Sequence, residues 1–223
     1  MRIAKHSIHG TAFIGVFASV TEKIGLFPLT LPQKQVKEFE DILGIEAIQT
    51  SIAACSLIGS LVKGNSEGFA VPEIIQENEL NNLRNSGIRI EVIEQVNALG
   101  NLMALNDFGG IVSPLLSEHS MNQLKKFFNI PLINATIAKT EIVGSCIVAT
   151  NKGFIANPNI DNPDYKLLKK TFKTLGQPTT ANFGDMFIAN DILATSNGAI
   201  VGPQTSGHEI LRIEEGLSGE GKN

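Results

Sequence analysis

The stretch GSCIVATNKGFIANP, residues 144–158, decides the fold of this chain, because its pattern occurs five times. A short apolar segment opens at or near a glycine, passes a polar turn, resumes as a second apolar segment and reaches a proline. This pattern predicts two strands joined by a hairpin turn in which Gly and Asn adopt positive φ. The equivalent prolines are 44, 42, 44 and 45 residues apart: Pro28, Pro72, Pro114, Pro158 and Pro203.

A helical segment is predicted after each proline, because apolar residues recur there at helical spacing. In the fourth copy they include Leu168, Phe172 and Leu175. Asn162 followed by Pro163 predicts an N-cap with proline in the first helical position.

Two further signals complete the repeating unit. Ser206 and Glu209 have the spacing of a capping box at the start of the fifth helix. A third strand follows some helices, most clearly where Ile88, Ile90 and Val92 alternate with charged residues. The unit is therefore strand, turn, strand, helix, strand. A repeat of about 44 residues that contains both strands and a helix fits neither a helical array nor a four-stranded propeller.

Units of this size must pack on one another, and we expect them to close into a ring. The fifth unit lacks its third strand, while residues 1–12 hold a strand-like segment that would supply it and remove an exposed sheet edge. The fold class expected is α/β, with one ring domain over residues 1–217 and a flexible tail over 218–223. The closing strand is residues 1–12, and the repeats are residues 13–56, 57–98, 99–142, 143–187 and 188–217.

Composition limits the classes of partner. The 223 residues carry 18 basic and 22 acidic side chains, which gives a net charge of −4. This charge argues against a protein that binds nucleic acid mainly through its phosphates. No apolar run is long enough to cross a bilayer, and the charged start is unlike a signal peptide. We expect a cytoplasmic protein with reduced cysteines.

No catalytic, metal or cofactor site is predicted. Cys55 and Cys146 lie in apolar segments where cysteine is usually a small buried hydrophobe, and the four histidines lack the spacing of zinc ligands. Residues 216–222 match the Gly-x4-Gly-Lys part of a phosphate-binding loop, but Asn223 replaces the Ser or Thr and no helix follows.

Two sets of polar residues are candidates for binding. The first is a basic strip on the fourth helix, for which a solvated helix face is the simpler interpretation: Lys166, Lys169, Lys170 and Lys173. The second is the residue after each strand-opening glycine or alanine, which a ring would gather near its axis to line a channel or a docking surface: Ser60, Asn101, Ser145 and Asn190.

Six motifs in series resemble the translation initiation factor 6 family, in its archaeal form, from about residue 2 to residue 217. They are IGV at 14–16, SLIGSL at 56–61, NALGNL at 97–102, IVGS at 142–145, VATNKG at 148–153 and GPQTSGHE at 202–209. The resemblance implies a pentein fold, in which five similar αβ units form a ring around a closed axial cavity.

The resemblance also implies a function without catalysis. Members bind the large (50S) ribosomal subunit beside the sarcin-ricin loop, mainly through ribosomal protein with limited rRNA contact, and keep the small (30S) subunit from joining. By motif, the ribosome-binding positions are Gly15, Ser60, Asn101, Ser145 and Asn190. We expect a monomer with no cofactor and no membrane, and a role in large-subunit maturation as well. The alternative is a guanidine-modifying enzyme on the same ring, which would need Cys55 or Cys146 as its nucleophile.

Overall fold

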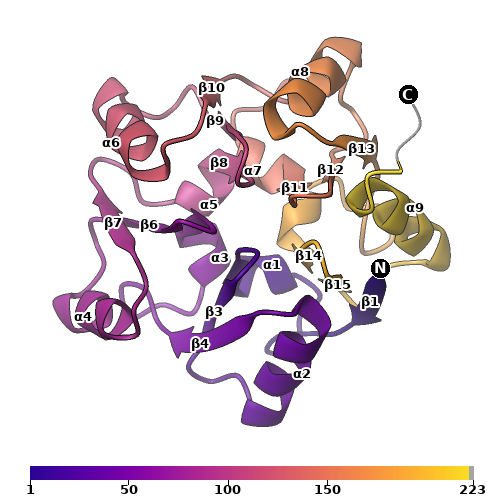
Figure 1. The fold of residues 1–223 in the computed structure, drawn as a ribbon. Helices are drawn as coiled ribbons and strands as arrows, with labels where there is room; N and C mark the ends of the chain where they lie inside the picture. Colours follow the sequence, from indigo (N-terminus) through magenta and orange to yellow (C-terminus); the bar gives the residue numbers. More distant parts are fainter. Residues whose placement is uncertain (221–223) are drawn as a thin grey trace.

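Five three-stranded sheets surround one axis in the computed structural model, which describes residues 1–220 (Figure 1). In every sheet the middle strand pairs antiparallel with the strand nearest the axis and parallel with the outermost strand. From the axis outward the sheets are β2 (Ser19–Val20), β3 (Ile24–Pro28), β4 (Glu46–Thr50); β5 (Lys63–Asn65), β6 (Gly68–Pro72), β7 (Ile90–Ile93); β8 (Met103–Leu105), β9 (Gly110–Val112), β10 (Leu132–Asn134); β11 (Ile147–Ala149), β12 (Gly153–Ala156), β13 (Leu175–Pro178); and β14 (Ile192–Ala194), β15 (Gly198–Val201), β1 (Arg2–Lys5).

One-turn helices, rather than the predicted strands, open the five units at the axis. We call them the inner helices: α1 (Ile14–Phe17), α3 (Ile58–Leu61), α5 (Leu99–Leu102), α7 (Val143–Cys146) and the 3-10 turn η1 (Ile188–Asn190). The prediction was wrong because four residues are too few to show a helical period.

Glycines allow the inner helices to touch backbone to backbone. A Cβ added at Gly59 would lie far closer than 3.0 Å to the carbonyl oxygen of Gly15, and one added at Gly100 would meet that of Gly59 in the same way. The same contact joins Gly144 to Gly100 and Gly15 to Ala189, so the repeated glycine is required at four of the five junctions between units.

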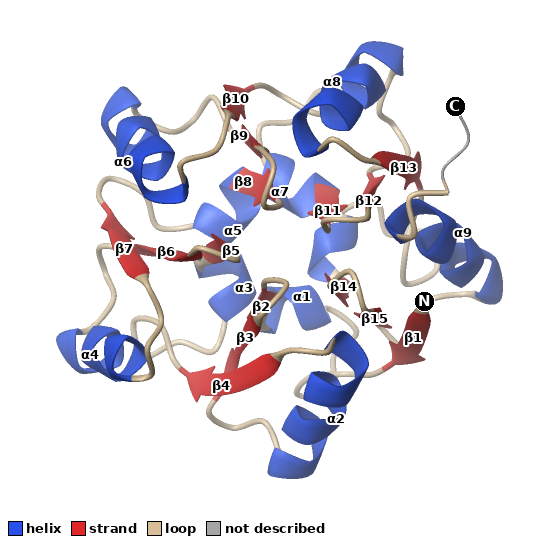
Figure 2. Cartoon of the chain, viewed as in Figure 1, coloured by secondary structure: helices blue, strands red, loops and turns tan. Residues whose placement is uncertain are grey.

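Five longer helices cover the outside of the ring (Figure 2). The predicted capping box is confirmed at Ser206 and Glu209, whereas the fourth N-cap is Asp161 rather than Asn162, and Leu175 belongs to β13. Asp161 takes the cap because its carboxylate accepts from the amide of Asp164 at 2.8 Å. The outer helices are α2 (Gln33–Leu43), α4 (Glu77–Asn85), α6 (Glu118–Phe128), α8 (Asn162–Phe172) and α9 (Gly207–Leu217).

The hairpin turns are closed by side chains. Asn106 Oδ1 accepts from the amides of Phe108 at 2.9 Å and Gly109 at 3.1 Å, and Thr150 Oγ1 closes the fourth turn in the same way. Among the predicted turn residues only Gly68 has positive φ, so the expectation of positive φ in the others was wrong. An Asn or Thr at the first position supplies an acceptor that makes such backbone unnecessary.

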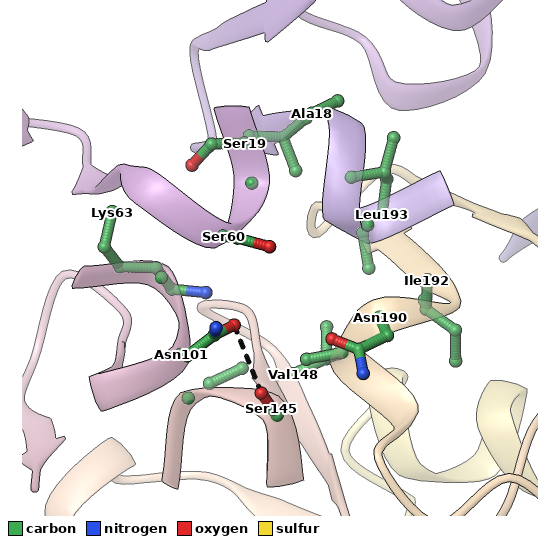
Figure 3. Close-up of a pocket in the computed structure, with 18 of the residues that line it drawn as sticks. Ala18, Ser19, Ser60, Lys63, Asn101, Ser145, Val148, Asn190, Ile192 and Leu193 are labelled. Carbon is green, nitrogen blue, oxygen red and sulfur yellow. Dashed lines mark hydrogen bonds between the residues drawn. The ribbon is translucent and has the colours of Figure 1, made fainter. Parts of the chain in front are cut away.

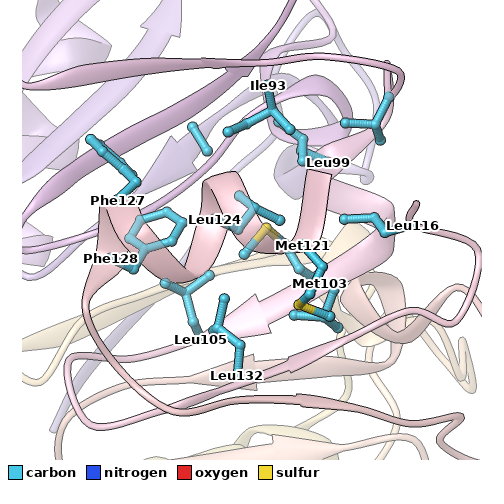
Figure 4. Close-up of a cluster of buried hydrophobic side chains, with 13 residues drawn as sticks. Ile93, Leu99, Met103, Leu105, Leu116, Met121, Leu124, Phe127, Phe128 and Leu132 are labelled. Carbon is cyan, nitrogen blue, oxygen red and sulfur yellow. The ribbon is translucent and has the colours of Figure 1, made fainter. Parts of the chain in front are cut away.

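Each hydrophobic core is shared between neighbouring units. The core around α6 contains Met103, Leu124 and Phe128 of the third unit and is completed by Ala70 from β6 of the second (Figure 4). The same position of the second strand completes the other four cores, through Leu26, Ile111, Ile155 and Ile200. A unit without its neighbour would therefore expose part of its core.

The two ends of the chain meet in one sheet. β1 pairs in parallel with β15 along Arg2 to Lys5, and the Met1 amino group bonds Glu214 Oε1 at 3.0 Å. The predicted closed α/β ring, with its pentein-type arrangement of five similar units, is confirmed. The division into repeats and a tail stays a prediction, and residues 221–223 of that tail lie outside the described residues.

The glycine contacts give a direct test of ring packing. Gly59→Ala should lower the free energy of unfolding by at least about 3 kcal/mol, because its methyl group would overlap the Gly15 carbonyl. Urea denaturation followed by circular dichroism measures the change. Gly207→Ala is the matched control, since nothing lies within 4 Å of its added Cβ. Equal stabilities for the two variants would contradict the proposed role of the contact.

Candidate functional site

The ring has two unlike faces. The helix face carries the inner helices, the loops that enter them and the loops that leave the middle strands. The turn face carries the hairpin turns, residues 21–24, 65–68, 106–109, 150–153 and 195–198. Any site at the axis lies between these two faces.

The structure brings all five sequence-predicted positions together at the axis. They sit on successive inner helices and line one axial cavity (Figure 3): Gly15, Ser60, Asn101, Ser145 and Asn190. Ser145 Oγ donates to Asn101 Oδ1 at 3.3 Å, linking the third and fourth units. Gly15 and Ser145 are buried, whereas the other three are half-buried. Those three are therefore the accessible members of the set.

The axial cavity has a volume of about 60 Å³. Lys63, the first residue of β5, also lines it and was missed by sequence reasoning. Lys63 is half-buried, and the loss of water around its ammonium lowers its pKa to about 8. The equivalent residues of the other units are neutral: Ser19, Ala104, Val148 and Leu193. The single charged residue at this position of the repeat could therefore have identified Lys63 from the sequence.

A network of hydrogen bonds closes the axis at the turn face. Glu22 of the first unit accepts from the amides of Asn151 and Ser196, both at 2.8 Å, and so reaches the fourth and fifth units. Asp107 accepts from the amide of Ser66 at 2.8 Å and from Asn151 Nδ2 at 2.6 Å. All five turns are thereby joined, and the polar groups of this face are largely occupied within the ring.

The helix face carries most of the exposed large apolar side chains, beside exposed charged residues such as Glu73 and Glu141. Among residues 1–220, eight of the eleven large apolar side chains that are exposed lie on it: Phe13, Leu29, Leu57, Ile74, Leu115, Ile142, Phe183 and Met186. The others are Phe108, Ile133 and Leu211. Phe183 is 84% exposed and precedes η1, so it stands out from the surface. Exposed apolar side chains gathered on one face are typical of a protein-binding surface.

The cysteines do not form a catalytic pair with histidine. Cys146 is buried in α7, where Asn157 Nδ2 donates to its sulfur at 3.8 Å, and burial raises the pKa of its thiol to about 11. Cys55 is half-buried and accepts from the amide of Leu57 at 3.4 Å. Within residues 1–220 no hydrogen bond joins a cysteine to a histidine, and no cluster of three or more His, Cys, Asp or Glu side chains could hold a metal.

The lysine strip lies away from the axis. Lys166, Lys169 and Lys170 project from α8 at the rim of the ring, and Lys173 follows at its C-cap, with its ammonium 6.0 Å from the centre of the Phe108 ring. All four are exposed. The strip is therefore separate from the axial positions.

No helix among residues 1–220 is long and apolar enough to span a membrane.

Fold and site together define a pentein-type ring with a polar axial cavity, a sealed turn face and an apolar helix face. A model of the eIF-6 family matches residues 3–216, so the chain belongs to the eIF-6 family. It is 36% identical to translation initiation factor 6 of Methanocaldococcus jannaschii over 96% of this chain and 97% of that protein. It is 35% identical to the protein of the same name from Staphylothermus marinus, over 98% and 99%.

Solved structures show a more distant likeness. DDAH from Pseudomonas aeruginosa, in a C249S mutant complexed with citrulline, matches with a TM-score of 0.44 and 13% identity, over 93% of this chain and 73% of that one. An agmatine deiminase from C. jejuni matches with a TM-score of 0.41 over 55% of this chain and 50% of that one. Likeness at this level carries no inference about activity.

Lys63 should make stability depend on pH. Its folded-state pKa of about 8 lies below the ordinary 10.5, so the unfolded chain binds more protons between these values and stability rises across that window. Lys63→Met should raise the free energy of unfolding at pH 7 by up to about 3 kcal/mol, with the gain shrinking toward pH 10.5. Urea denaturation in low-salt buffer measures it, with Lys23→Met as the surface control. A gain that stays constant from pH 7 to 10 would contradict the burial of this ammonium.

Cys146 should be inert in the native ring. With a pKa of about 11, about one molecule in ten thousand carries the thiolate at pH 7. Iodoacetamide at pH 7 should therefore leave Cys146 unmodified in the native protein and label it after unfolding in urea and return to the same pH. Peptide mapping by mass spectrometry reads both states. Rapid labelling of native Cys146 would favour the guanidine-modifying enzyme instead.

Proposed function

We propose that this protein is a cytoplasmic translation initiation factor that binds the large (50S) ribosomal subunit and prevents the small (30S) subunit from joining it. Membership of the eIF-6 family supports the role in translation, as do the relatives named translation initiation factor 6. The same binding would serve in large-subunit maturation, where premature joining must also be prevented.

The observation that carries the proposal is the apolar helix face. A factor that acts by excluded volume needs a rigid body and one surface of ordinary interface size. The shared cores and the glycine contacts supply rigidity, and the exposed side chains of Phe13, Leu57 and Phe183 supply apolar anchors on a single face. One copy of the ring presents the whole face, so a monomer suffices.

Charge favours ribosomal protein over rRNA as the main contact. The chain has a net charge of −4, and phosphate-led binding requires basic side chains at the interface. The lysine strip is the feature of this chain that could contact rRNA phosphates. It lies on α8 at the rim of the ring. We therefore place the contact on ribosomal protein near the sarcin-ricin loop, with limited contact to rRNA.

No catalysis is part of the proposal. The buried Cys146 thiol and the lack of a cysteine–histidine pair among the described residues both weigh against the guanidine-modifying alternative. A blocking factor requires no bond to be made or broken.

Substitutions on the helix face should weaken binding to the large subunit. Leu57→Asp places a charge on an exposed apolar position and should reduce affinity about tenfold, equivalent to about 1.4 kcal/mol. Asn101→Arg should also weaken binding, because it places a bulky cation at the axis. Co-sedimentation with purified large subunits measures both variants, and circular dichroism checks that they fold.

Leu211→Asp is the matched control, because Leu211 is also exposed and apolar but lies on α9 at the outside of the ring. It should bind like the wild type. When small subunits are added to large subunits, the wild-type protein should reduce the number of joined ribosomes relative to a sample without it. Leu57→Asp should cause a smaller reduction. Unchanged binding by Leu57→Asp and Asn101→Arg together would remove the helix face from the interface.

A further inference from the structure

Lys63 is the charged member of a five-fold set of otherwise neutral residues. It starts β5 directly after α3, and its ammonium points toward the middle of the ring (Figure 3). The equivalent residues of the other units are Ser19, Ala104, Val148 and Leu193. Of these equivalents, Ser19, Val148 and Leu193 line the axial cavity with Lys63, so a single cation lies among neutral residues.

No protein group neutralises this cation. Lys63 makes no hydrogen bond or ion pair with any residue among 1–220, and no Asp or Glu lines the axial cavity. Burial is the sole cause of its lowered pKa, and at a value of about 8 the side chain is still mostly an ammonium at pH 7. An uncompensated charge in such a place is destabilising unless something else pairs with it.

The two acids that line the neighbouring space are already engaged. Glu22 and Asp107 line a separate, smaller space between the cavity and the turn face. Their carboxylates accept from backbone amides and side chains of the hairpin turns, as in the contacts to Asn151, Ser196 and Ser66. They hold the turns together and leave Lys63 without a counter-ion.

The rest of the cavity wall offers hydrogen-bond donors. The Asn101 amide oxygen is taken by Ser145, which leaves its two N–H donors for another acceptor. The side chains of Ser60 and Asn190 line the cavity and make no hydrogen bond to another described residue. These side chains belong to three different units and line the same cavity (Figure 3).

The volume limits what can enter. A cavity volume of about 60 Å³ corresponds to roughly four to six water positions, since each water needs about 10–15 Å³. A halide or an oxyanion of phosphate size fits these limits, whereas a larger organic acid such as gluconate does not. One ammonium with neutral donors around it suits a compact anion of low charge.

We propose that the axial cavity is a binding site for a compact inorganic anion, chloride or a phosphate-sized oxyanion, held by the ammonium of Lys63 and by the side-chain donors of Asn101, Ser60 and Asn190. The anion supplies the negative charge that the chain does not place beside Lys63. Asn101 also belongs to the proposed ribosome-binding positions, so the tests below change Lys63, which is not one of them.

Bromide tests the location directly, since it mimics chloride and is identified by anomalous X-ray scattering. Crystals of the full chain soaked in sodium bromide should show an anomalous peak in the axial cavity beside Lys63 Nζ. Crystals of Lys63→Met, whose side chain has similar length and no charge, should show none. A peak that persists in Lys63→Met would overturn the assignment to Lys63, and a wild-type cavity that holds neither bromide nor, in a second soak, phosphate would overturn the site.

Thermal unfolding tests the same site in solution and separates the two anion sources. Sodium chloride and sodium phosphate are each compared with sodium gluconate at equal ionic strength. At about a hundredfold the dissociation constant, the anion that binds should raise the wild-type midpoint by about 5 °C. Lys63→Met should shift by less than about 1 °C, and Lys23→Met, a surface control, should shift like the wild type. Equal shifts in wild type and Lys63→Met would mean a general salt effect and would overturn the proposal.

Discussion

The ring depends on the contact between inner helices, in which the glycine of one unit lies against the backbone carbonyl of the preceding unit. This contact sets the distance between neighbouring units and therefore the width of the space they enclose. Because the helices meet without side chains between them, the axial cavity has a volume of only about 60 Å³. The residues that follow each inner helix, among them Ser19 and Lys63, are then directed into that narrow space.

The two faces differ because each unit enters the axis through a helix and leaves it through a hairpin. The carboxylates of turn residues such as Glu22 and Asp107 accept hydrogen bonds from the backbone amides of neighbouring turns, which leaves little capacity for a partner. The loops that enter the helices hold exposed apolar side chains such as Leu57 and Ile142. An acidic protein can thus present a docking surface whose affinity comes mainly from apolar burial and shape.

Much of the fold could be predicted from the sequence because each unit repeats the same local signals. The prolines and the Asn or Thr turns showed the period, and the unpaired strand at the N-terminus indicated closure. The inner helices could not be recognised, since four residues such as 58–61 read equally well as a strand.

The site was predicted in part. The polar residues after the glycines were expected at the axis, and they lie there, but their burial depends on neighbours from other units and could not be read from one segment. Buried Ser145 and half-buried Asn101 occupy the same place in the repeat. The apolar helix face is scattered over eight sites in the chain, so no local window contains it. Only the folded ring assembles it.

The pairing of β1 with β15 has a consequence for synthesis. A ribosome releases a chain from the N-terminus, so the first strand made must wait for a partner that is nearly the last, almost two hundred residues later. Until then the core shared between the fifth and first units, with Leu193 and Ile200, stays open. The ring can therefore close only after β15 has been made, late in synthesis.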